Sequence, residues 1–117
     1  MKKIILTLSV ASAIIFISGC KSLSDMRMNG AANSFVSNKS LNEVSECILS
    51  GWHEKRFLTG PMHVYIQPYK NGRTVYVDEY TWVADITPEA DGHTGIKYYT
   101  QSNGRNQEMQ DVIRACI

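Results

Sequence analysis

Residues 62–79 read MHVYIQPYKNGRTVYVDE, and this stretch decides the fold class. Two alternating runs, 62–70 and 73–79, flank Asn71-Gly72. That dipeptide is the strongest short signal for a β-hairpin, because both central residues of a type I′ turn need positive φ. A two-residue loop pairs Lys70 with Arg73 and specifies the register. It assigns four aliphatic residues to one face: Val64, Ile66, Val75 and Val77.

Two more strands are predicted to extend this hairpin. A tight turn at Glu79-Tyr80 starts a third strand, and residues 95–100 form a fourth after a loop over residues 88–94. Alternation adds five inward-facing residues to the apolar face: Trp82, Ala84, Ile86, Ile96 and Tyr98.

Helices are predicted on both sides of the strands. Ser40-Leu41-Asn42-Glu43 is a capping box that starts a helix ending within residues 53–56. Apolar residues follow at helical spacing, and a second set marks a helix at the end of the chain. The two stripes comprise Leu41, Val44, Ile48 and Trp52 in the first helix and Met109, Val112, Ile113 and Cys116 in the second. The sequence thus predicts a small α+β domain of order α-β-β-β-β-α, an antiparallel four-stranded sheet with two helices on one face.

The N-terminal region has the pattern of an export signal. A basic start, Met1-Lys2-Lys3, precedes a run from Ile4 to Ile17 without a charge. The run is shorter than the roughly 20 residues that span a bilayer. A buried core helix is the other interpretation, but the apolar residues of this run leave no polar face. We therefore expect a signal peptide.

The end of this run, Ile17-Ser18-Gly19-Cys20, resembles the lipobox of bacterial lipoproteins. The resemblance covers residues 1–20. It implies that residues 1–19 are removed by cleavage between Gly19 and Cys20, and that Cys20 carries acyl chains such as palmitate, which anchor the protein to a membrane. Lys21 in place of aspartate favours the periplasmic side of the outer membrane. Residues 20–39, rich in Ser, Asn, Ala and Gly, are predicted to be a flexible tether that precedes a domain over 40–117.

The remaining cysteines form a candidate disulfide. With Cys20 assigned to lipid, Cys47 and Cys116 are left, and an oxidising periplasm favours their pairing. A free catalytic thiol is the competing interpretation, although neither cysteine lies in C-x-x-C or beside a histidine. Both lie in apolar helix stripes, so a bridge between them clamps the two helices over the sheet.

Charge argues against a nucleic-acid partner. Of the 12 Lys and Arg residues, Lys2 and Lys3 precede Cys20, which leaves ten against 11 Asp and Glu. No polybasic face is implied. Between Arg73 and Lys97 all charges are acidic, and this segment is interpreted either as a solvated edge or as a patch for a basic partner or cation.

The sequence predicts no catalytic, metal or cofactor site. The three histidines, His53, His63 and His93, form no zinc motif. Convergence of His63 and His93 with an aspartate on a metal is possible in principle, but solvated side chains are the simpler interpretation. We expect a non-enzymatic protein without a cofactor.

The sheet face without helices is the candidate binding surface. The register places four tyrosines on it: Tyr65, Tyr69, Tyr76 and Tyr99. Tyrosine is enriched at interfaces, although it also suits half-wet strands. One hypothesis is a lipid-anchored protein that binds another envelope protein through this face. The alternative is a periplasmic inhibitor or immunity lipoprotein, which inserts residues 88–94 into a toxin, a phage component or a cell-wall hydrolase.

Overall fold

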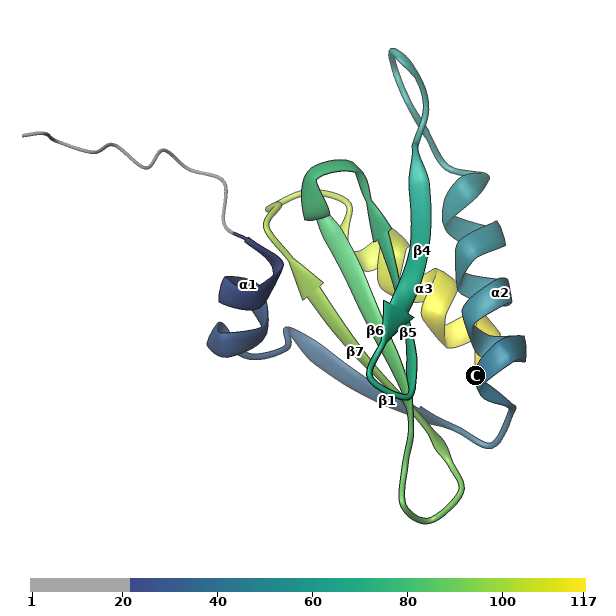
Figure 1. The fold of residues 1–117 in the computed structure, drawn as a ribbon. Coiled ribbons are helices and arrows are strands. Elements are labelled where there is room, and N and C mark those ends of the chain that lie inside the picture. Colours follow the sequence, from purple (N-terminus) through teal and green to yellow (C-terminus); the bar gives the residue numbers. More distant parts are fainter. Residues whose placement is uncertain (1–21) are drawn as a thin grey trace, which may run out of the picture.

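The computed structural model describes residues 22–117, which form a five-stranded antiparallel sheet and three helices (Figure 1). The sheet has the order β1-β7-β6-β5-β4. Its strands are β1 (Asn33–Ser37), β4 (Val64–Tyr69), β5 (Gly72–Val77), β6 (Trp82–Pro88) and β7 (Thr94–Thr100). The helices are α1 (Leu23–Asn29), α2 (Leu41–His53) and α3 (Asn106–Cys116). A small separate hairpin pairs β2 (Arg56–Phe57) with β3 (Gly60–Pro61), and a 3-10 turn, η1 (Asp78–Tyr80), joins β5 to β6.

The main core lies between the sheet and helices α2 and α3, which cover the same face (Figure 1). Trp52 is its centre: it is fully buried, its indole N–H donates to the Met109 carbonyl at 3.0 Å, and its ring meets Tyr98 edge-on. The predicted inward face is confirmed, because eight of its nine residues are buried and Ile66 packs against them. Hydrophobic burial between the sheet and these two helices is the main stabilising contribution.

A disulfide joins Cys47 of α2 to Cys116 of α3, as predicted. Their Cα atoms lie 5.7 Å apart and 69 positions apart in the chain. The bridge connects the two helices over the sheet, so the predicted clamp is confirmed.

The predicted tether is folded from residue 22 onward, which corrects our expectation for most of residues 20–39. Ser22 and Asp25 form a capping box: the Ser22 hydroxyl accepts from the Asp25 amide, and the Asp25 carboxylate accepts from the Ser22 amide. This box starts α1, and its S-x-x-D pattern was visible in the sequence. The described fold therefore includes residues 22–39 and is not limited to residues 40–117.

The predicted count of four strands is also wrong, because β1 adds a fifth at the edge of the sheet. β1 pairs antiparallel with β7, from Asn33 opposite Tyr98 to Ser37 opposite Thr94. The segment escaped prediction because it is mostly polar and exposed. An edge strand can be held by backbone hydrogen bonds with little apolar burial of its own. The observed order is α-β-α followed by the β2–β3 hairpin, four strands and a final helix.

The β4–β5 hairpin has the predicted faces but a different register. Tyr69 pairs with Gly72 and Tyr65 with Tyr76, and the two turn residues are Lys70 and Asn71. The shift moves each cross-strand partner by two residues. Because side chains alternate with period two, every residue stays on its predicted face.

Candidate functional site

Helix α1 lies on the sheet face opposite α2 and α3, which we call the outer face (Figure 1). Met26 of α1 is buried against Val83 and Tyr99, and these three residues form a second small core. Tyr99 is consequently only 6 % exposed. The expectation of an uncovered face is therefore wrong on the α1 side, and Tyr99 is a packing residue.

Arg27 ties α1 to the same face through polar contacts. Its guanidinium forms two hydrogen bonds with the Asp85 carboxylate, at 2.7 and 2.8 Å, and a third with the Thr74 hydroxyl at 2.9 Å. The Asp85 hydrogen bonds raise the pKa of Arg27. The guanidinium also lies over the Tyr69 ring, 3.8 Å from its centre. Tyr69 is thus half-buried and already has a cationic partner within the chain.

The accessible part of the outer face is a stack of three tyrosines, which we call the tyrosine ladder: Tyr65, Tyr76 and Tyr80. The β4–β5 register places Tyr65 directly opposite Tyr76, with ring centres 5.3 Å apart. The ring centre of Tyr80 lies 4.7 Å from that of Tyr76, with the two rings tilted by 40°. Tyr65 is 44 % exposed, and the other two rings are half-buried. Of the four predicted tyrosines, the structure brings Tyr65 and Tyr76 together, and it adds Tyr80, which the alternation pattern did not assign to a strand.

The turn after β5 delivers Tyr80 to the ladder in a strained backbone conformation. Glu79 and Tyr80 both adopt positive φ, 61° and 56°, which costs a non-glycine residue about 1 kcal/mol or more. The turn is held by the Thr81 amide and hydroxyl, which donate to the Asp78 carbonyl, and by the Gln101 side chain, which donates to the carbonyls of Glu79 and Tyr80. Strain that the surroundings maintain in this way is concentrated at functional positions in proteins.

Carboxylates adjoin the tyrosine ladder. Asp78 accepts from Tyr65, which raises the pKa of that phenol, and burial raises the pKa of Tyr76. Asp78 also lies 3.1 Å from the ring of His63, and the exposed Glu79 follows it. Tyr65 and Tyr76 therefore keep their phenolic protons at physiological pH, and that of Tyr65 is donated to Asp78.

Two shallow hollows lie on the outer face. One, of about 300 Å³, is lined by Met26, Asn29, Gly30, Ala32, Tyr99, Thr100 and Gln101. The other, of about 290 Å³, is lined by Tyr69, Lys70, Asn71, Asp85, Thr87, Pro88, Glu89, Lys97 and Tyr99. Both lie at the lower limit of typical small-molecule sites. Neither includes a residue of the tyrosine ladder.

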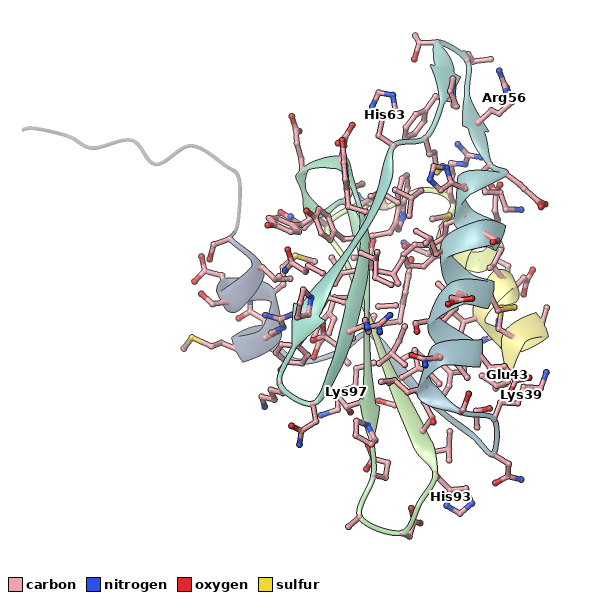
Figure 2. All side chains as sticks on the ribbon, turned by 45° about the vertical axis from the view of Figure 1, so that its right-hand side comes forward. Lys39, Glu43, Arg56, His63, His93 and Lys97 are labelled. Carbon is pink, nitrogen blue, oxygen red and sulfur yellow. A yellow bond between two sulfur atoms is a disulfide. The ribbon has the colours of Figure 1, made fainter. Side chains whose placement is uncertain are left out.

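The histidines do not converge on one site. Figure 2 shows His63 beside the projecting β2–β3 hairpin and His93 at the opposite end of the sheet. His63 pairs with Asp78 at 3.1 Å and His93 with Asp91 at 2.9 Å. Within residues 22–117, no three His, Cys, Asp or Glu residues are grouped to hold a metal ion, and no helix is long and apolar enough to cross a membrane.

The predicted lipidation and cleavage positions, Cys20 and Gly19, lie outside the described residues. Comparison with known proteins adds no family to these observations: no protein-family model matches the chain, and no curated protein matches it.

Proposed function

We propose that this protein is a lipid-anchored, non-catalytic component of the bacterial cell envelope that binds another envelope protein through the tyrosine ladder. The observation that carries the proposal is the stack of Tyr65, Tyr76 and Tyr80 at the accessible end of the outer face. Stacked aromatic rings that carry hydroxyl groups supply apolar contact area and hydrogen-bonding groups at once. They are also already ordered, which lowers the entropic cost of binding.

The neighbouring charges favour a basic segment of the partner. Asp78 and Glu79 adjoin the ladder, and the chain has no Lys or Arg between Arg73 and Lys97. Lysine or arginine side chains can lie over a tyrosine ring and pair with a carboxylate at the same time. Such a complex should form more slowly and bind less tightly as the salt concentration rises.

The lipid anchor of the proposal is supported by the lipobox Ile17-Ser18-Gly19-Cys20, which follows a basic and an apolar segment. Lys21 after the cysteine supports the outer membrane, on its periplasmic side. Growth with labelled palmitate tests the anchor. The wild-type protein should incorporate label and Cys20→Ala should not, whereas label that persists in Cys20→Ala would contradict lipidation at this residue.

The binding proposal is tested with the combined variant Tyr65→Ala/Tyr76→Ala. The tagged, lipidated protein is cross-linked in intact cells, purified, and compared with the wild type for the protein captured. We expect the double variant to lose the captured protein, because it loses two of the three stacked rings. Tyr69→Ala is the matched control: it removes a tyrosine from the same strand and face, outside the ladder, and should keep the partner. Equal capture by all three proteins would reject the ladder as the binding site, provided that circular dichroism shows all three folded.

The inhibitor hypothesis has its own support in the β6–β7 loop. This loop projects beyond the sheet (Figure 1) and is ordered by backbone bonds from Glu89 to His93 and from Gly92 to Glu89. The Asp91 carboxylate accepts from the His93 amide, which lowers the pKa of Asp91. A preformed loop of this kind suits insertion into an enzyme cleft. Cells in which residues 89–93 are replaced by Gly-Gly should then lose protection against the toxin, phage or hydrolase concerned; full protection would exclude this loop.

A further inference from the structure

We propose that the tip of the β2–β3 hairpin, where Leu58 lies in the turn between the two strands, is a second membrane contact, which inserts into the bilayer that holds the lipid on Cys20. The inference rests on the proposed lipid anchor. It goes further because it states how the domain is oriented on the membrane and which of its own residues enter the lipid.

The hairpin presents an apolar side chain, Leu58, that the fold does not use. It projects past the end of the sheet at the top of Figure 1. Leu58 is completely exposed, at 108 %, and the adjacent Phe57 is 39 % exposed. A leucine at the end of a projecting hairpin gains nothing from folding in water. It would gain from transfer into hydrocarbon.

The base of the hairpin is rigid although each strand has only two residues. Phe57 stacks on Trp82 with ring centres 6.1 Å apart, and the guanidinium of Arg105 lies 5.6 Å from the centre of the Phe57 ring. Arg105 also donates to the Arg56 carbonyl at 2.9 Å, and the Met62 amide donates to the Lys55 carbonyl. The hairpin is therefore held in its projecting position, and inserting its tip requires little further ordering.

Cationic side chains surround this base, as expected for a segment that meets a lipid surface. Lys55 and Arg105 both contact Glu108, at 3.5 and 2.8 Å. Arg56 is exposed on the hairpin itself (Figure 2). Long basic side chains can keep their charged groups among lipid phosphates while neighbouring apolar residues enter the acyl region.

Because Cys20 is close to the domain, we favour the bilayer, and not another protein, as the partner of the hairpin tip. Ser22 is the N-cap of α1, and only two peptide units separate it from Cys20, about 7 Å when fully extended. A lipid on Cys20 thus holds the domain directly against the membrane. In Figures 1 and 2 the hairpin tip is the uppermost part of the molecule, and α1 begins lower, on the left.

Tryptophan placed at the tip tests this contact. The lipidated protein is reconstituted in vesicles of three parts phosphatidylethanolamine to one part phosphatidylglycerol, with and without brominated acyl chains that quench nearby tryptophan. The variant is Leu58→Trp. Its control is Val36→Trp, on β1 and also exposed, at 62 %, but beside the β6–β7 loop at the other end of the sheet.

We expect brominated lipid to quench the added emission of Leu58→Trp at least twofold more than that of Val36→Trp, after subtraction of the wild-type signal. Equal quenching of the two variants would overturn the proposal. An emission shift of Leu58→Trp that requires native membranes, and is absent in protein-free vesicles, would also overturn it, because the tip would then bind a protein. Palmitate labelling distinguishes failure of the hairpin contact from failure of the lipid anchor. If the protein incorporates palmitate but Leu58→Trp is not quenched, the anchor on Cys20 stands and only the hairpin contact is rejected.

Discussion

Arg27 and Asp85 lie 58 positions apart in the chain, yet together they determine how the N-terminal segment sits on the sheet. Asp85 is only 3 % exposed and receives the guanidinium through two hydrogen bonds, with the Thr74 hydroxyl as a third partner. By sequence alone, Asp85 belongs to a run of acidic residues and Arg27 to a predicted tether. No local pattern relates the two residues, because the pairing depends on where α1 packs.

Arg27→Ala should lower the free energy of unfolding by about 3 kcal/mol, because it leaves the buried Asp85 carboxylate without its counter-charge. Urea denaturation followed by circular dichroism measures the change. Arg114→Ala is the matched control, since its ion pair with Asp111 is exposed and worth roughly 0.5 kcal/mol or less. Equal losses in the two variants would mean that α1 is not held by this pair.

The burial of Tyr98 leads us to expect that the protein becomes less stable at alkaline pH. Its side chain is fully buried, and burial raises the pKa of its phenol far above the ordinary value. From about pH 10 upward the unfolded chain releases this proton while the folded protein keeps it, so the free energy of unfolding falls as pH rises. Below pH 10 both states are protonated and the contribution is fully present.

Tyr98→Phe removes this titration and should give a shallower decline of stability between pH 10 and 11. At pH 7 the variant should lose about 1 kcal/mol, because the hydroxyl no longer donates to the Asn106 side chain at 2.6 Å. Urea unfolding at several pH values tests both effects. A decline above pH 10 as steep as in the wild type would assign the alkaline effect to other groups, and Tyr69→Phe, which keeps Tyr98, serves as the reference.

At the level of elements, the β4–β5 hairpin shows that a correct sequence signal can have a different physical cause. Asn71-Gly72 predicted the hairpin, but the positive φ belongs to Lys70, at 52°. Gly72 is the first residue of β5, and a Cβ there would lie 1.9 Å from the Ile86 carbonyl oxygen of β6. The glycine is therefore needed for the close approach of two strands, which no single-strand pattern reveals.

Substitutions of Gly72 and Lys70 test whether the turn is formed by Lys70-Asn71 or by Asn71-Gly72. Gly72→Ala should lower the free energy of unfolding by about 2 kcal/mol or more, because β5 and β6 must move apart. Lys70→Gly should be neutral or stabilising by up to about 1 kcal/mol, because glycine adopts positive φ without strain. Thermal unfolding of both variants tests the assignment. The opposite ranking would place the turn at Asn71-Gly72, as the sequence alone suggested.

The two helices of the main core depend on their disulfide in a way that can also be measured. Cys47 and Cys116 close most of the domain into one loop, so on the chain-entropy model their replacement by alanine should cost about 4 kcal/mol. The double variant should unfold at a much lower urea concentration than the oxidised wild type. The reduced wild type should match the variant; a wild type unaffected by reduction would contradict the model.

For the whole molecule, the sequence predicted the strands and helices whose apolar residues recur with a clear period. It missed the elements that are held mainly by backbone hydrogen bonds. Strands β4 to β7 and helices α2 and α3 follow from apolar periodicity, and Cys47 and Cys116 follow from their place in it. The edge strand β1 and the β2–β3 hairpin carry little apolar burial, so periodicity cannot detect them. The candidate site was half predictable: Tyr65 and Tyr76 came from alternation, but Tyr80 depends on a turn with two left-handed residues.

The N-terminal boundary of the domain can be tested by comparing the stabilities of two shortened proteins. Residues 22–117 contain every described element, whereas residues 40–117 lack α1 and β1. Without those two elements, β7 becomes an edge strand, and Tyr99 and Val83 lose the cover of Met26. Exposure of such side chains costs about 1.5–3 kcal/mol each. The Thr94 hydroxyl also loses its bond to the Lys39 carbonyl, at 2.8 Å.

The protein that starts at residue 40 should therefore be at least about 3 kcal/mol less stable than the one that starts at Ser22. It should also bind the dye ANS, which reports exposed apolar surface. Urea denaturation of both proteins, each with the disulfide formed, measures the difference. Equal stability would return residues 22–39 to the role of a tether; with the proposed lipid on Cys20, the domain could then reach partners away from the membrane. The expected loss would show that the stable fold includes Ser22, two residues after Cys20, so the proposed anchor would hold its partners close to the membrane surface.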